Sequence, residues 1–165
     1  VGRDVFKTSD VEACTKEMYS AEYRLSKPNQ YFSLCDLPGV GESLTADKKY
    51  YEWYDELLRK SSVVLYILRA DQRDFSIDLN VYNELIKAGS HEKHTLLAIN
   101  CADKIEPISR STELSAAQKT NLDRKINDIR KIFGIDNVIA YSAETGYNFN
   151  AFVNRIALMI KSEYC

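Results

Sequence analysis

The sequence predicts an α/β fold: a three-layer α/β/α sandwich whose sheet is mostly parallel, with one antiparallel edge strand. Two observations lead to this prediction. Segments rich in Val, Ile and Leu alternate along the chain with amphipathic segments of helical periodicity. The apolar runs at 61–70, 94–100 and 137–143 also lack polar alternation, which is typical of strands that helices cover on both faces of a parallel sheet.

Length and composition fit one ordinary globular domain. The 165 residues, 45% hydrophobic and 28% charged, suffice for one core, so we expect a single domain over 1–165. The formal net charge of −2 argues against a nucleic-acid-binding surface, and no apolar run approaches the roughly 20 residues of a membrane-spanning helix. Four cysteines without CxxC pairing argue against a zinc site and favour reduced thiols in a cytoplasmic protein.

The N-terminal part of the chain predicts an antiparallel hairpin. Residues 19–27 and 31–36 can both be extended. Pro28 and Asn29 lie between them in positions that favour a tight turn. Since tight turns join antiparallel neighbours, we expect this hairpin to supply the antiparallel edge of the sheet.

A helix is predicted over 43–60, with Ser43 or Thr45 as its cap. Packing against the sheet is the simplest explanation for its aromatic residues. Any exposed members would instead form a surface for a homodimer or a protein effector. The aromatic set is Tyr50, Tyr51, Trp53 and Tyr54.

The remaining helices are expected between and after the three apolar strands. They span 78–88, ending at Gly89; 114–133, ending at Gly134; and 149–164. We expect the mixed charges of the second of these helices to form a solvated face. Those charged residues are Arg124, Lys125, Asp128, Arg130 and Lys131.

Polar side chains follow the ends of three predicted strands. Asp36 ends the hairpin, Asn100 and Asp103 follow the second apolar strand, and Ser142 lies at the end of the third. Ligands of such sheets bind beyond the carboxyl ends of the strands, so we expect these residues to share one rim. Because Asp36 is followed by a Pro-Gly corner, it suits a metal ion and a phosphate.

The loop at 100–104, with the sequence NCADK, suits the recognition of guanine. The Asp103 carboxylate can accept two hydrogen bonds from adjacent N–H donors, which guanine presents through its ring N–H and its 2-amino group. Adenine lacks the 2-amino group. Hydrogen bonds to a charged acceptor contribute about 1.5–3 kcal/mol each, so this contact would discriminate between the purines. Asn100 would hold the loop, while Ser142 and Ala143 would close over the base.

These residues resemble the guanine-nucleotide motifs of GTPases. The run from Asp36 to Gly39 matches the DxPG box, Asn100 to Asp103 matches NKxD except at its lysine, and 141–143 matches the SA box. The chain is similar over nearly its whole length to the Era-like GTPases of the translation-factor-related class, which are P-loop NTPase G domains. It most resembles the YeeP/YfjP group of small bacterial GTPases, through the stretches SDVEACT, DLPGVGES and ADKIEP.

The resemblance implies GTP or GDP and Mg²⁺ as ligands, and GTP hydrolysis that drives a molecular switch. Asp36 would hold the magnesium ion, and Gly39 would offer its backbone N–H to the terminal phosphate. Thr15 is the candidate switch threonine, with Thr8 and Ser9 as alternatives. The implied metal ligands are Thr15 and Asp36, and the implied nucleotide-binding residues are Asp36, Gly39, Asn100, Asp103, Lys104, Ser142 and Ala143. No catalytic residue is assigned.

The sequence departs from the family pattern in three places. A phosphate-binding loop has the pattern G-x-x-x-x-G-K-[ST], yet no glycine of this chain is followed by lysine. We expect that loop and the first strand to precede Val1, so that this chain is an incomplete G domain and inactive alone. The other interpretation is a truncated form with a rearranged sheet or with exchange between chains. Cys101 replaces the lysine whose stem packs along the base, with Lys104 as a partial substitute, and Val40 stands where Ras-like proteins carry a water-orienting glutamine.

Two other functions stay open. A degenerate GTPase fold that binds a protein partner without hydrolysis agrees with the missing loop and with Cys101 and Val40. An unrelated flavodoxin-like domain would need another phosphate or phosphorylation site, and the sequence offers none better than Asp36.

Overall fold

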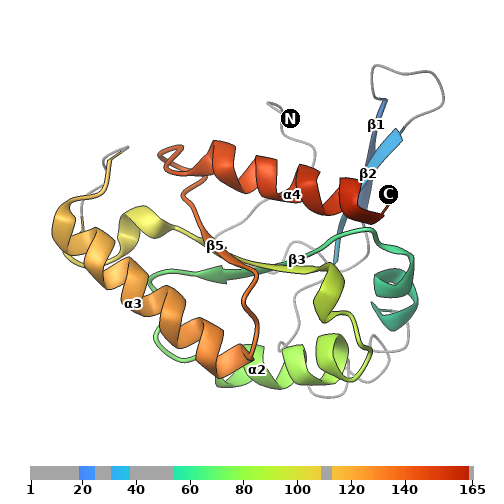
Figure 1. The fold of residues 1–165 in the computed structure, drawn as a ribbon, viewed down its shortest axis with the longest axis horizontal. Coiled ribbons are helices and arrows are strands. Elements are labelled where there is room, and N and C mark those ends of the chain that lie inside the picture. Colours follow the sequence, from blue (N-terminus) through green and yellow to red (C-terminus); the bar gives the residue numbers. More distant parts are fainter. Residues whose placement is uncertain (1–18, 25–30, 38–53, 109–112, 164–165) are drawn as a thin grey trace. The chain divides into compact units, whose positions relative to one another are not determined.

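The structure is a computed structural model that describes residues 19–24, 31–37, 54–108 and 113–163 (Figure 1). The chain divides into two compact units, Val1–Asp47 and Lys48–Cys165, and each is described by itself. The first contains an antiparallel pair of strands, and the second contains a parallel sheet with its helices. The predicted α/β class is confirmed.

In the first unit, two strands form the predicted antiparallel hairpin. β1 (Tyr19–Arg24) pairs with β2 (Tyr31–Asp36). Asp36 ends β2 and lies opposite Tyr19 in the register of the pair. The turn predicted at 28–29 lies outside the described residues. The hairpin thus delivers the Asp36 carboxylate to the end of a strand, as the sequence predicts.

The second unit contains a three-stranded parallel sheet with β4 at its centre. β3 (Val64–Arg69) and β5 (Val138–Ala140) pair with the two edges of β4 (Thr95–Asn100). The first five residues of β4 are all buried, whereas Ile67 on β3 is 53% exposed. The prediction of burial on both faces is therefore right for β4 and wrong for β3. Within the described residues β3 pairs on one side only, which leaves it less covered than the central strand.

α4 (Phe149–Glu163) covers one face of this sheet (Figure 1). Its Phe152 side chain packs against Leu96 and Ala98 of the central strand and against Tyr141. The rings of Tyr141 and Phe152 are stacked, with centroids 4.1 Å apart. The loop after β5 is therefore anchored to α4 by an aromatic contact.

The other face carries α2 (Ser76–Val81), its continuation as a π-helix (Tyr82–Lys87), and α3 (Ala116–Phe133). Both Tyr82 and Phe133 are fully buried, and their rings meet edge to face with centroids 5.2 Å apart. With α4 on the opposite face, the second unit has the predicted three layers of helix, sheet and helix.

The first helix on this face differs from the segment predicted at 78–88. It begins at Ser76, whose backbone N–H donates to the Asp74 carboxylate at 2.9 Å. From Tyr82 the helix continues with the wider turns of a π-helix, and it ends before Gly89. The stop at the glycine was predicted, whereas the apolar periodicity gave no sign of the wider turns.

Both ends of α3 are specified by local sequence. Ser115 precedes the helix and forms a capping box with Gln118, in which each residue binds the other's backbone N–H. Gly134 ends the helix with a left-handed φ of 67°, and its N–H donates to the Arg130 carbonyl at 2.8 Å. The predicted end is confirmed, and the start lies two residues after the predicted Leu114.

Two side-chain predictions can be assessed in the second unit. Lys125 does not belong wholly to a solvated face, because it is half-buried and its Nζ donates to the Gln72 carbonyl. Tyr54 is 2% exposed and lies in the helical stretch 54–60, so it packs in the core. The other three members of the aromatic set lie outside the described residues.

Among the helices of the described part of the chain, none combines the length and apolar character needed to cross a membrane.

Candidate functional site

The loops that follow β4 and β5 are joined through one side chain. Asn100 is the last residue of β4, and its Oδ1 accepts a hydrogen bond from the Cys101 N–H at 2.7 Å. The same oxygen accepts a second hydrogen bond from the Ala143 N–H at 3.1 Å. Because one amide oxygen serves both loops, a displacement of either loop loosens the other.

The backbone at Cys101 has the left-handed conformation, with φ 60° and ψ 36°. Residues other than glycine adopt this conformation uncommonly, so surrounding contacts must hold it. The Asn100 side chain binds the Cys101 N–H, and the Cys101 carbonyl accepts from the Lys104 N–H at 2.9 Å. The chain consequently turns at once into the short 3₁₀ helix Ala102–Lys104, which carries Asp103.

Asp103 is fully buried, and its two carboxylate oxygens have different surroundings. Oδ1 accepts a hydrogen bond from the Ser142 hydroxyl at 2.5 Å. Oδ2 is buried and has no hydrogen-bond partner among the described residues. A buried acceptor without a partner costs about 1–3 kcal/mol, so such atoms usually have a role. Oδ2 is therefore an acceptor for which the described protein supplies no donor.

Ser142 is held as firmly as the carboxylate that it binds. Its Oγ also accepts from the Thr145 N–H at 3.1 Å, while its own N–H donates to the Tyr147 carbonyl at 2.9 Å. Gly146 closes the loop with a φ of 76° and donates its N–H to the Ser142 carbonyl at 3.0 Å. β5 ends at Ala140 rather than at 143 as predicted, because the backbone N–H of Ser142 bonds to Tyr147 within this loop instead of continuing the ladder with β4.

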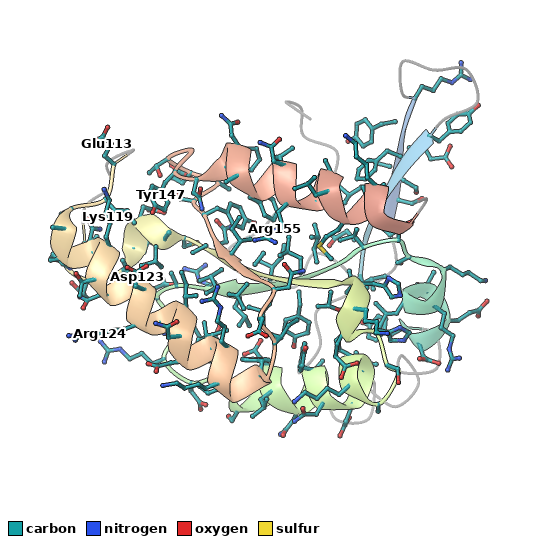
Figure 2. All side chains as sticks on the ribbon, in the orientation of Figure 1. Glu113, Lys119, Asp123, Arg124, Tyr147 and Arg155 are labelled. Atoms are coloured by element: carbon teal, nitrogen blue, oxygen red, sulfur yellow. The ribbon has the colours of Figure 1, made fainter. Side chains whose placement is uncertain are left out.

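Two tyrosines beside this loop have pKa values raised above the usual value. Burial raises the pKa of Tyr141, and the nearby Cys101 thiol raises it further. Burial also raises the pKa of Tyr147, with a smaller contribution from the Asp123 carboxylate on α3. Figure 2 shows Tyr147 and Asp123 at the same end of the second unit. The loop after β5 thus lies near the first half of α3.

Gln118 on α3, which binds the backbone of Asp103, was not predicted as a site residue. Gln118 on α3 is fully buried, and its Nε2 donates to the carbonyls of Asp103 at 3.4 Å and Ile105 at 3.2 Å. One turn later, Asn121 donates to the Glu106 carbonyl at 2.8 Å. The S-x-x-Q spacing predicts a capping box, but sequence does not reveal contacts with a loop 13 to 15 residues earlier.

A cavity of about 410 Å³ adjoins the Asp103 loop on its α3 side. Lys104, which was predicted to substitute for the missing base-packing lysine, lines this cavity. The Arg69 guanidinium lowers the pKa of Asp71, another residue of the cavity wall, and Lys104 contributes to a smaller extent. The Lys104 side chain therefore lies close enough to Asp71 to interact with it electrostatically.

The other predicted site residues belong to the first unit. Asp36 is half-buried at the end of β2. Gly39 and Thr15 lie outside the described residues, as do the alternative switch residues and Val40. Because Asp36 and Asp103 fall in different units, a shared rim for the two acids stays a prediction.

No established family profile matches the chain, but curated proteins of Escherichia coli strain K12 do. The uncharacterized protein YkfA is 35% identical over 162 residues, which cover 97% of this chain and 55% of YkfA. The uncharacterized protein YfjP is 32% identical over 97% of this chain and 55% of YfjP. The putative uncharacterized protein YeeP is 26% identical over 71% of this chain and 56% of YeeP. The chain spans about half the length of the curated relatives that it matches.

Solved structures with a similar fold include GTPases and a probable GTP-binding protein. Era in complex with MgGDPNP and a 16S ribosomal RNA fragment has a TM-score of 0.72 at 22% identity, covering 96% of this chain and 49% of Era. A probable GTP-binding protein, EngB, has a TM-score of 0.61 at 17% identity, and the match covers 87% of this chain and 80% of EngB. LeoA, a bacterial dynamin GTPase from ETEC, has a TM-score of 0.63 at 12% identity, and the match covers 97% of this chain and 31% of LeoA. The chain therefore has the α/β fold of P-loop GTPase domains.

Proposed function

We propose that the full-length protein binds guanine nucleotide and hydrolyses GTP with Mg²⁺ as a molecular switch. The buried Asp103 carboxylate carries this proposal. Ser142 holds one of its oxygens, and the other has no donor among the described residues. A GTPase fold that presents such an acceptor after its central strand is suited to a base with adjacent N–H groups.

Guanine recognition would use both oxygens of the carboxylate. The ring N–H and the 2-amino group of guanine would donate to Asp103, each bond contributing about 1.5–3 kcal/mol because the acceptor is charged. The Ser142 hydroxyl fixes the rotation of the carboxyl group before the base arrives. Because Asp103 exposes almost no surface in this structure, the residues that cover its free oxygen would have to move as the base enters.

Phosphate and magnesium binding would come from the other predicted residues. Asp36 and Thr15 would hold Mg²⁺, since carboxylate and hydroxyl oxygens are ligands that this ion accepts, and the ion would neutralise phosphate charge. Gly39 would bind the terminal phosphate through its N–H. The 165 residues contain no Gly-Lys pair, so we place the phosphate-binding loop elsewhere in the full-length gene product and treat residues 1–165 as most of one G domain.

Calorimetric titration of the full-length gene product tests this function. We expect GDP and GTP to bind and ATP not to bind, because adenine offers no 2-amino donor to Asp103. The Asp103→Ala variant should lose GDP binding, while Asp128→Ala, which removes an exposed acid from α3, should retain it. Equal affinity for ATP and GTP would refute the proposal.

A second candidate is a GTPase fold that binds a protein partner without hydrolysis. Cys101 at the position of the base-packing lysine and the lack of a Gly-Lys pair favour it. If the full-length gene product contained no G-x-x-x-x-G-K-[ST] loop and bound no guanine nucleotide, this function would replace the first.

A further inference from the structure

We propose that Gln118 is a positioning residue for guanine recognition. Its side-chain amide, buried at the start of α3, fixes the backbone of the Asp103 loop and thereby aims the carboxylate at the base. The inference rests on the proposed function in one respect only, namely that the ligand is a guanine nucleotide. The positioning of the loop itself can be measured without any ligand.

The amide of Gln118 has a single orientation that satisfies its partners. Its Oε1 accepts hydrogen bonds from the Ser115 N–H and from the Ser115 hydroxyl, both at 3.1 Å. Its Nε2 donates to two carbonyls, those of Asp103 at 3.4 Å and Ile105 at 3.2 Å. Exchanging oxygen and nitrogen would place the amide oxygen against carbonyl oxygens, so the partners settle the assignment.

These bonds clamp Asp103 from its two ends. Gln118 holds the backbone carbonyl from α3, and Ser142 holds the carboxylate from the loop after β5. Hydrogen bonds weaken steeply when their angles are distorted, and a two-pronged contact needs both angles to be right. A rotation of the Asp103 backbone would therefore weaken the contact with the base even though the carboxylate is retained.

Asn121 offers a comparison with Gln118, because it binds the same loop farther from Asp103. Asn121 lies one turn along α3 and donates to the Glu106 carbonyl at 2.8 Å. It holds the same loop three residues beyond Asp103, and its side chain is only half-buried. Removing this bond should disturb Asp103 less than removing the bonds of Gln118.

Three variants separate positioning from helix capping. Gln118→Glu keeps an oxygen that can accept from the Ser115 N–H, as glutamate does in capping boxes, but it removes the N–H donors to the loop. Ser115→Ala removes the capping hydroxyl but keeps the backbone N–H that binds the Gln118 amide oxygen, and it keeps the Gln118 donors to the loop. Gln118→Asn is a neutral second variant whose shorter side chain withdraws the donor. Thr120→Ala, which affects only an exposed hydroxyl bonded to Ala116, is the control.

The readout is the ratio of affinities for GDP and for inosine diphosphate, which lacks the 2-amino group. We expect the wild-type full-length protein to favour GDP by about tenfold or more, since one bond to a charged acceptor is lost with inosine. Gln118→Glu and Gln118→Asn should lower this ratio by at least about threefold. Ser115→Ala should lower the melting temperature and leave the ratio unchanged. An unchanged ratio in both Gln118 variants would overturn the inference while leaving the proposed function intact.

Amide hydrogen exchange in the ligand-free protein provides the second measurement. The N–H groups of Lys104 and Ile105 bond within the loop, to the carbonyls of Cys101 and Ala102. Both should exchange faster in the Gln118 variants than in Ser115→Ala. If the wild type did not prefer GDP to ATP, the proposed function would fail, and exchange rates would still decide whether Gln118 holds the loop. Equal exchange rates in all variants would show that Gln118 does not hold the loop, and would overturn the inference.

Discussion

The two edges of the parallel sheet differ in how their ends are held. On the β5 side, Asn100, Asp103 and Ser142 link the two loops through side-chain hydrogen bonds that span about 40 positions of the sequence. On the β3 side, the end is held by a backbone hydrogen bond, from the Ala70 N–H to the Asn100 carbonyl at 2.8 Å, and Ile67 is 53% exposed. The comparison teaches that the loops carrying Asn100, Asp103 and Ser142 are linked to each other by side chains within the second unit.

Removing the Phe133 side chain from the core beneath the parallel sheet should have the largest effect on the free energy of unfolding. Phe133 is fully buried on α3, and its ring contacts Tyr82 and Phe75 edge to face. Phe133→Ala should lower the free energy of unfolding by about 3–5 kcal/mol, because it removes apolar contacts and leaves a cavity. Chemical denaturation would measure this loss. A loss below about 1 kcal/mol would show that the core does not depend on this contact.

Separating the loops of the β5 side should have an intermediate effect. Asn100→Ala leaves the N–H groups of Cys101 and Ala143 without their acceptor. We expect a loss of about 1–3 kcal/mol in unfolding free energy, together with weaker guanine binding. Asn83→Ala on the exposed surface of the π-helix serves as the control and should change neither quantity. Wild-type guanine affinity in Asn100→Ala would contradict the linkage of the loops.

A smaller effect is expected from an acid distant from both loops. The His91 ring, which lies 3.1 Å from the Asp55 carboxylate, lowers the pKa of Asp55, and Arg59 lowers it further. A carboxyl group whose pKa is lowered by folding stabilises the protein at pH values above its unfolded pKa. This stabilisation is lost as the pH falls through the folded pKa. Asp55→Asn should thus be less stable than the wild type at pH 7, with the difference shrinking as the pH falls from about 4 through the lower folded pKa. Melting temperatures from pH 7 down to the acid limit of folding would check it, and a difference that does not shrink below pH 4 would contradict the assignment.

The smallest effect should come from the exposed edge itself. Ile67→Thr keeps a β-branched residue on β3 and replaces the ethyl branch of an exposed side chain with a hydroxyl group, so the unfolding free energy should change by less than about 0.5 kcal/mol. Denaturation of the full-length gene product would test this. A loss of 2 kcal/mol or more would show that another part of the protein covers β3 there.

The sequence predicted most elements of the fold because their signals are local. Apolar runs gave the strands, periodicity gave the helices, and Gly134 marked the end of α3. What it missed depends on partners distant in sequence. The exposure of Ile67 follows from the position of β3 in the sheet, and the burial of Lys125 follows from the Gln72 carbonyl. Strand order and loop-to-helix contacts cannot be read from periodicity alone.

The candidate site shows the same division. Asn100, Asp103 and Ser142 were predicted because the chemistry of a base constrains residue type at the ends of strands. Gln118 was missed because its role depends on the backbone carbonyls of Asp103 and Ile105, which any residue could supply. The left-handed backbone at Cys101 was also missed, since residues other than glycine rarely adopt it.

The central claim is that the Asp103 carboxylate reads the edge of guanine. Its most direct test is the affinity of the wild type and of Asp103→Asn for GDP and for xanthosine diphosphate, whose 2-oxo group suits an amide donor. We expect the wild type to prefer GDP and the variant to prefer the xanthine nucleotide. A variant that retained the wild-type preference for GDP would contradict it.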